Sequence, residues 1–279
     1  MDFHHWWAIF AGQPAPMFCT ALALIAAFLM GFSRSGIGAG GFVVSPLMVL
    51  ALGPTVGVAV VAVLMLPAAF TGYLQHRREA KPETLYPLLL GAIVGTLVGG
   101  LLLWRLAASG ELALLHRRLE IVVALLSLIY VVLVVLRQKI ADAVGAVGQP
   151  TARGLFLTAS AIGGSQTLAN SGSPLLTIYF LCYGVGKEHF VGAQVGFLLV
   201  QNLLKLIPLV LLGILHFGNA TVALVLMPLT FAGSWLGQRF YRHANEKMFF
   251  GLYALLLVIG FVASVALLVG RVSLLNHLV

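Results

Sequence analysis

The stretch Gly31–Leu52, GFSRSGIGAGGFVVSPLMVLAL, decides how the rest of the chain is interpreted. It places several glycines, Arg34, three serines and Pro46 inside an otherwise apolar region. Glycine adds backbone freedom and proline removes a donor, so we expect a helix to break here. Inside a bilayer, broken backbone is stable only where protein or a watery cavity satisfies its polar groups. Because free N–H groups beside an arginine suit an anion, the stretch predicts an anion site.

The composition indicates a membrane protein. The chain is 61% hydrophobic and only 9% charged, which is more apolar surface than a soluble domain needs, so the lipid bilayer is its expected partner and solvent. The net charge of +8 is the ordinary basic excess of membrane loops, and no nucleic-acid partner is expected. Cys19 and Cys182 lie in apolar runs without metal-ligand spacing and are interpreted as packing residues.

Apolar runs long enough to span a bilayer recur along the whole chain. The uninterrupted runs are 16–33, 55–75, 86–106, 119–137, 190–214, 219–240 and 249–271. Two further regions, 34–53 and 153–184, are interrupted by Gly, Ser, Asn and Pro. We therefore predict an all-α polytopic integral membrane protein with about eight transmembrane helical units. They form two related halves, each with a broken or re-entrant helix.

The halves are expected to be a first transmembrane repeat over 1–145 and a second over 150–279, within one membrane domain. A proline follows the interrupted segment in each half, at Pro46 and at Pro174. Paired interrupted segments are the best sequence indication of a transporter's binding site. Whether the repeats are parallel or inverted is left open, as is the oligomeric state, with a homo-oligomer among the options.

Two other features of the halves are less informative. The pairs Gly95-x3-Gly99 and Gly233-x3-Gly237 are interpreted as helix-packing faces. Lys and Arg are almost evenly distributed among four joints: 76–84, 108–118, 137–153 and 239–247. Consecutive joints cannot all be cytoplasmic, so the positive-inside rule does not orient the chain.

The positions of the charges give the sharpest inference. All eight acidic residues lie in joints or at helix ends. Hard cations usually need carboxylate ligands, and proton pumps usually need buried Asp, Glu or His, so a cation carrier is disfavoured. Arg34 and Lys205 are the two basic residues that no joint accommodates. The pattern favours a small anion as the substrate.

Lys205 is the stronger candidate. It lies in the run 190–214 and shares one helix face with Gln194 and Gln201, which precede it by eleven and four residues. At about 15 Å from the nearer helix end it is too deep for easy snorkelling. Pro208 is expected to kink this helix. The alternative interpretation is a lysine that pairs with carbonyl groups in the bundle.

Arg34 has two equally plausible interpretations: a topogenic arginine at the membrane interface, or a guanidinium that binds an oxyanion. Together with neutral donors of both breaks and of the 190–214 helix, it completes the predicted substrate site. The predicted site residues are Arg34, Ser35, Gly38, Gly40, Gly41, Asn170, Ser171, Gln194, Gln201, Asn202 and Lys205. We expect no catalytic residue, no metal ligand and no cofactor, because neither a nucleophile–base pair nor a metal-ligand cluster is visible in the sequence.

These motifs resemble the TauE/SafE family of membrane proteins, often called sulfite exporters. In the first half the resemblance rests on GFSRSGIGAGGFVVSPLM (31–48) and Gly72-Tyr73. In the second half it rests on Asn170-Ser-Gly-Ser-Pro174, Tyr179, Lys187-Glu188-His-Phe190, Asn202-Leu-Leu-Lys205-x-x-Pro208 and Gly213. The resemblance covers about residues 16–271. Ser173 departs from the family, in which a proline commonly precedes Pro174.

The resemblance implies a carrier for a small sulfur-containing anion such as sulfite, thiosulfate or an organosulfonate. We expect a secondary transporter of the bacterial cytoplasmic (inner) membrane, with its site between the repeats and alternating access. Proton coupling, through the substrate itself or through Lys205, is left open. The alternatives are an intramembrane enzyme, a passive anion channel and a membrane assembly subunit without a substrate.

Overall fold

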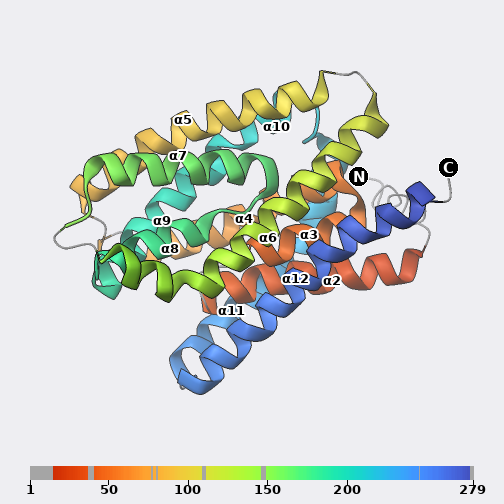
Figure 1. Cartoon of the computed structure of the whole chain (residues 1–279). Helices are drawn as coiled ribbons and strands as arrows, with labels where there is room; N and C mark the ends of the chain where they lie inside the picture. The colour runs from red at the N-terminus through yellow and green to blue at the C-terminus, as the bar shows by residue number, and fades with distance from the viewer. Residues whose placement is uncertain are drawn as a thin grey trace.

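The computed structural model describes residues 15–36, 41–76, 78–79, 81–108, 111–145, 149–244 and 246–276. Within these ranges the regular structure is entirely helical (Figure 1). The first half contains α2 (Pro16–Gly36), α3 (Gly41–Leu52), α4 (Pro54–His76), α5 (Pro82–Ala107) and α6 (Leu112–Val144). The second contains α7 (Ala152–Ala169), α8 (Ser173–Cys182), α9 (Lys187–Leu204), α10 (Leu206–Leu211), α11 (Phe217–His243) and α12 (Glu246–Asn276).

The break in the second half follows directly from its sequence. Thr151 caps α7 by accepting a hydrogen bond from the Gly154 N–H at 3.1 Å. The helix ends at Asn170, whose φ of 52° is left-handed, and Gly172 follows with a φ of 120°. Both residue types tolerate positive φ, so the chain can reverse here before α8 begins with Ser173 and Pro174. The predicted interruption of 153–184 is confirmed.

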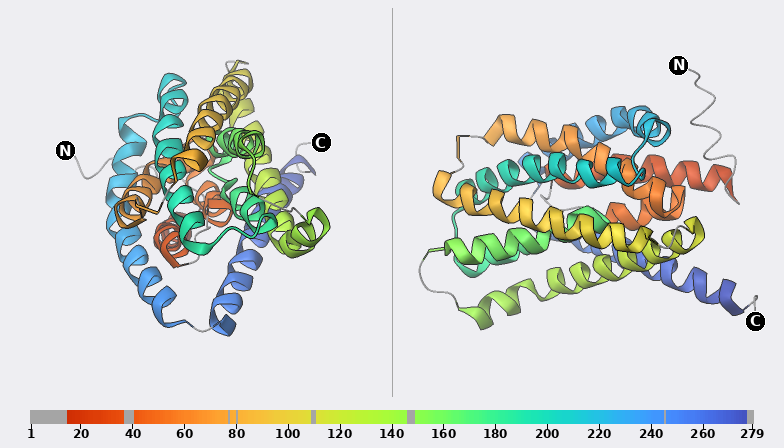
Figure 2. Two further views of the ribbon diagram at one scale, coloured as in Figure 1. Left: turned by 90° about the vertical axis from the view of Figure 1, so that its left-hand side faces the viewer. Right: turned by 90° about the horizontal axis from the view of Figure 1, so that it is seen from above.

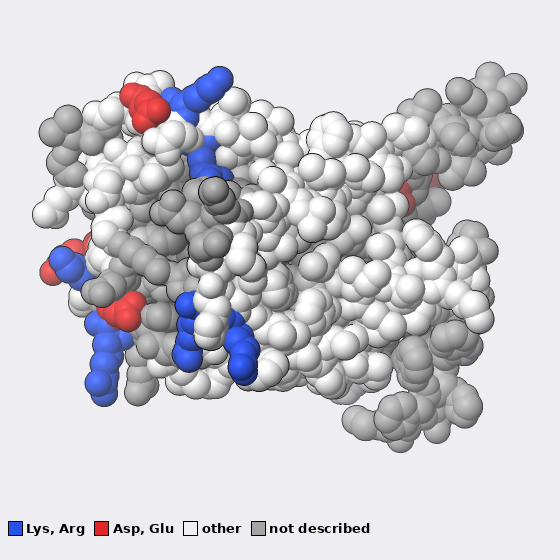
Figure 3. Space-filling model, turned by 90° about the horizontal axis from the view of Figure 1, so that it is seen from below, with Lys and Arg blue, Asp and Glu red and all other residues white. Residues whose placement is uncertain are grey.

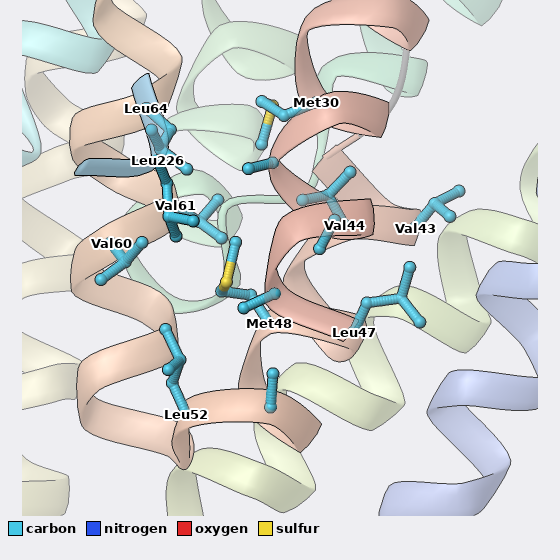
Figure 4. Packing of buried hydrophobic residues seen from close by; sticks show 14 of the residues in the cluster. Met30, Val43, Val44, Leu47, Met48, Leu52, Val60, Val61, Leu64 and Leu226 are labelled. Carbon is cyan, nitrogen blue, oxygen red and sulfur yellow. The ribbon is translucent and has the colours of Figure 1, made fainter. Parts of the chain in front are cut away.

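The break in the first half lies later than the sequence suggested. Helix α2 continues through Arg34 to Gly36, and α3 begins at Gly41, while residues 37–40 lie outside the described part. Pro46 follows the start of α3 and lies inside that helix. Almost every residue of α3 is buried, so the surrounding helices hold it in place on all sides (Figure 4).

The run 190–214 contains two helices instead of one. Helix α9 ends at Leu204 and α10 begins at Leu206, with Lys205 between them. Pro208 has no N–H to pair with the carbonyl group of Leu204, which weakens the helix at this point. The predicted kink is confirmed, and it places Lys205 at the break.

Six described helices are long and apolar enough to cross a membrane: α2, α4, α5, α6, the α9–α10 unit and α11. The described apolar stretch of α12, Ala254–Val269, is shorter. The outer surface carries large exposed apolar side chains, among them Leu97, Val135 and Leu211. A surface of this kind suits lipid rather than water. The chain is thus a multi-pass helical membrane protein.

Two pairs of helices cross at very short distances: α2 with α11, and α5 with α7. Glycines make this possible, since a Cβ atom at Gly31 would overlap the backbone of Thr230, and one at Gly95 would overlap the backbone of Ser160. A Cβ at Gly99 would similarly approach Gly164 O and Thr167. Close approach through small residues is typical of helix pairs in membranes. The interpretation of Gly95-x3-Gly99 as a packing face is confirmed.

The helices run broadly along one direction, so their joints gather at two ends (Figures 1 and 2). The joints α4–α5, α6–α7, α8–α9 and α11–α12 lie at one end, where Thr84 of α5 pairs with His189 of α9 at 2.9 Å. The joint α5–α6 lies at the other end, where Thr55 pairs with His116 at 3.0 Å. Helix α8 returns the chain to the end from which α7 started. For this reason the joints at 137–153 and 239–247 share one end.

The described Lys and Arg residues are unevenly divided between these ends. Figure 3 shows the basic side chains of one face gathered towards one end. The end with the α4–α5, α6–α7 and α11–α12 joints carries Arg78, Lys81, Arg137, Lys139, Arg153, Arg239 and Arg242. The end with the α5–α6 joint carries Arg105, Arg117 and Arg118. Of the four basic joints that seemed equivalent in the sequence, three therefore lie at one end of the molecule and one lies at the other.

Substitution of Gly95 by Ala should destabilise the α5–α7 crossing, because the added methyl group meets backbone atoms that cannot move aside easily. We expect a loss of about 1–3 kcal/mol, seen as a lower melting temperature of the detergent-purified protein. Gly251→Ala in α12 is the matched control, since no atom lies within 4 Å of its added Cβ. It should be neutral or stabilising by up to about 1 kcal/mol. Equal effects of the two substitutions would contradict the packing argument.

Candidate anion site between the helix breaks

The two helix breaks meet in the interior. A Cβ atom at Gly41, the first residue of α3, would overlap the carbonyl oxygen of Asn170, the residue that ends α7. The same Cβ would lie 3.0 Å from Cε of Met65 in α4. Only glycine allows the backbones to approach this closely. The structure thus brings together segments that are more than a hundred residues apart in sequence.

Lys205 lies beside this junction and is fully buried, with 0% of its surface exposed. Its ammonium group donates to Asn170 Oδ1 at 2.7 Å and contacts Met65 Sδ at 3.0 Å. Because a thioether is a weak acceptor, the amide oxygen of Asn170 is the stronger of these two acceptors. Both partners are neutral. A lysine ammonium has three donors, and the described hydrogen bonds occupy two of them.

Asn170 joins three elements. Its backbone ends α7, its Oδ1 atom accepts from Lys205, and its Nδ2 atom donates to the Val58 carbonyl of α4 at 2.9 Å. Both ends of the side-chain amide are therefore used in this conformation. We conclude that Asn170 positions Lys205 rather than presenting an unused donor.

Arg34 lies in the last turn of α2. Its Nη2 atom is buried, and no hydrogen-bond partner for it is present among the described residues. Its positive charge acts on that of Lys205, so the two cations belong to one electrostatic environment. Taken as a whole, the Arg34 side chain is half-buried. Ser35 follows it and is half-buried.

The polar face of α9 is fixed by its neighbours. Gln201, one turn before Lys205, donates through Nε2 to Thr96 Oγ1 of α5 at 3.0 Å and to Gly163 O of α7 at 3.4 Å. Its Oε1 atom is buried and has no partner among the described residues. Gln194 is also buried, two turns earlier on the helix. The predicted shared face of α9 thus points into the protein.

Three further side chains near the junction contain buried polar atoms without a described partner. Gln166 and Asn202 are fully buried, and neither end of either amide is paired. The hydroxyl group of Ser171, in the second break, is likewise unpaired. Most buried polar groups in proteins are hydrogen-bonded, so such a concentration needs an explanation. A bound polar ligand is the explanation that we develop below.

The structure brings part of the predicted set of site residues together. Of the predicted residues, Gly41, Asn170 and Lys205 lie together, while Gly38 and Gly40 lie outside the described residues. The sequence argument missed Met65 and Thr96. Met65 gives no signal in the sequence, because an apolar residue in an apolar helix is normally core. Thr96 does give a signal in the sequence, because it is a polar residue between the packing glycines Gly95 and Gly99 of α5.

Two pockets of the described surface lie away from this junction. One, with a volume of about 160 Å³, is lined by the C-terminal turns of α11 from Trp235 to His243. The other, of about 440 Å³, lies between the first turns of α5 and α7. Neither is lined by Lys205, whose side chain is fully buried. No group of His, Cys, Asp and Glu within the described ranges could hold a metal ion.

Comparison with known proteins agrees with this architecture. The family model described as "Sulfite exporter TauE/SafE" matches residues 23–266, which is most of the chain. Neither a curated protein nor a solved structure matches the chain. The matched region includes both helix breaks and the α9–α10 unit. The chain therefore belongs to the sulfite exporter TauE/SafE family of membrane transporters.

Proposed function

We propose that this protein is a secondary carrier for a small sulfur-containing anion: sulfite, thiosulfate or an organosulfonate. The observation that carries the proposal is the buried ammonium group of Lys205 beside Arg34, with neutral partners only among its described hydrogen bonds. Burying an uncompensated charge is costly, and an anion between the two cations offsets that cost. The family supplies the sulfur-containing class of substrate.

The packing of the helices supports two related halves with inverted orientation. Helix α2 of the first half packs on α11 of the second, and α7 of the second packs on α5 of the first. Likewise α3 contacts α12, as α8 contacts α6, and α4 contacts α9. If each helix of the first half (1–145) is replaced by its counterpart in the second half (150–279), and the reverse, the same set of helix contacts results. In addition, α2 and α7 start at opposite ends of the molecule (Figure 1).

A buried cation at such an interface favours a carrier that alternates access over a passive channel. The described buried side chains around Lys205 also lack a nucleophile–base pair, which speaks against an intramembrane enzyme. We place the protein in the cytoplasmic membrane of a bacterium. Since Lys and Arg favour cytoplasmic joints, the end with the α4–α5, α6–α7 and α11–α12 joints faces the cytoplasm.

Substitution of the two cations tests the site. Lys205→Ala and Arg34→Ala should each reduce saturable uptake of labelled sulfite into vesicles by at least about tenfold, because each removes charge compensation for a buried anion. Lys205→Arg should restore little, since a planar fork cannot replace a compact ammonium held by Asn170. Arg78→Ala, in an exposed joint, is the control. Unchanged transport by both Ala variants would refute the site.

A second test separates function from stability. Lys205→Met should leave the melting temperature equal or higher, since it removes a buried charge. Asn170→Gly keeps the left-handed backbone but removes the Lys205 partner, and should cost about 2 kcal/mol. When Asn170→Gly is combined with Lys205→Met, the loss of stability caused by Asn170→Gly should be smaller, because no ammonium group is left unpaired. If Lys205→Met destabilises as much as Asn170→Gly, the lysine is structural.

The membrane orientation can be tested with single cysteines in a variant that lacks Cys19 and Cys182. Glu111→Cys in the α5–α6 joint and Arg78→Cys in the α4–α5 joint are both exposed and lie at opposite ends. A thiol reagent that cannot cross membranes should label Glu111→Cys in intact cells. It should label Arg78→Cys only after the cells are opened. The reverse pattern would overturn the orientation.

A further inference from the structure

The region between α7 and α9 contains more hydrogen-bond acceptors than a site for a simple anion needs. Gly163 and Asn170, two turns apart on one face of α7, are contacted by Gln201 and Lys205, which lie one turn apart on α9. Gln166 lies between Gly163 and Asn170 on that face, and Asn202 lies between Gln201 and Lys205. Gln166 is therefore on the face of α7 that α9 contacts, and the buried Asn202 lies in the same turn of α9 as Gln201 and Lys205.

Each of these amides needs a donor as well as an acceptor. An amide oxygen accepts hydrogen bonds and its nitrogen donates them, whichever way the group is turned. Gln166 Oε1, Gln201 Oε1 and Asn202 Oδ1 are buried and without a described partner. Leaving such atoms unsatisfied costs about 1–3 kcal/mol each. A ligand that fills the site has to offer donors to some of them.

The nearby cations cannot both pair the amide oxygens and bind the anion. The remaining donors of Lys205 and the Nη2 atom of Arg34 can turn either to the amide oxygens or to a bound anion. A fully deprotonated oxyanion only accepts hydrogen bonds, so it would take these donors and leave the amide oxygens unpaired. A monoanion that brings its own N–H or O–H group satisfies both sets of atoms.

We infer that the transported species is a monoanion that carries a hydrogen-bond donor: a monoprotonated oxyanion such as hydrogen sulfite, or a sulfonate with a hydroxyl or amino group. This inference rests on the proposed anion carrier and deepens it. For a protonated oxyanion the substrate itself carries the proton across the membrane. A buried carboxylate is then unnecessary for proton coupling.

Two sulfonates of similar size provide the first arm of the test. Hydroxyethanesulfonate and propanesulfonate are both fully ionised monoanions near neutral pH, and they differ by a hydroxyl group in place of a methyl group. We measure how each one inhibits sulfite uptake by the full-length protein in vesicles. The wild type should bind the hydroxyl compound about tenfold more tightly. Equal inhibition would overturn the inference and would indicate that water alone pairs the amides.

Variants of Gln166 and Asn202 test whether their amides cause the preference for the hydroxyl-bearing sulfonate. Gln166→Met and Asn202→Leu keep the side-chain volume and should bring the ratio of the two inhibition constants close to one. Gln138→Met, whose amide is exposed and pairs with Asp142, is the matched control and should keep the wild-type ratio. Because the readout is a ratio, a general loss of folded protein does not change it. An unchanged ratio in both site variants would exclude these amides as the recognition groups.

The dependence of uptake on pH provides the second arm and separates the two kinds of donor. As the pH falls through neutral, sulfite acquires a proton, whereas thiosulfate remains a dianion. Sulfite uptake at constant total concentration should rise with its monoprotonated fraction, while thiosulfate uptake should stay low and flat. Sulfite uptake that follows the dianion instead would contradict the inference and leave the carrier intact. If none of these anions is taken up or inhibits, the proposed function itself fails.

Discussion

The hydrogen bond from Lys205 to Asn170 is the constraint on which the rest of the structure depends. An ammonium group in a bilayer interior cannot be hydrated, and its two described acceptors are a neutral amide and a thioether. The protein holds it by placing a left-handed helix end directly opposite the α9–α10 break. The same contact leaves the charge only partly compensated. An incompletely compensated cation is poor for stability and well suited to binding an anion.

Two local features of the backbone make this contact possible. Asn170 can end α7 because asparagine tolerates a left-handed backbone, and its carbonyl can then lie against Gly41. Around this junction, helix α3 is buried on nearly all sides. Irregular backbone at this depth is therefore enclosed in protein, as the absence of hydration requires. Glycine pairs at the α2–α11 and α5–α7 crossings bring the helices close enough to complete the enclosure.

Much of this arrangement was predictable from the sequence, because lipid leaves few alternatives for polar groups. The isolated basic residues Arg34 and Lys205, and the Asn170 break, stand out against apolar surroundings. What the sequence could not provide was distance: nothing in it indicated that Met65 contacts Lys205. The end of α2 was also placed too early, because glycine and serine only permit a break, and neighbouring helices decide where it occurs. The count of eight spanning units is not confirmed, since six helices in the described part of the chain meet the length and hydropathy of a span.

The glycine crossings also determine which parts of the protein can move. Each tight pair, α2 with α11 and α5 with α7, joins one helix from the first half to one from the second. Each tight pair therefore connects the two halves of the sequence directly. A conformational change that keeps these crossings intact would have to move each tight pair as a unit. The most closely packed helix pairs and the two halves of the sequence are therefore different divisions of the same chain.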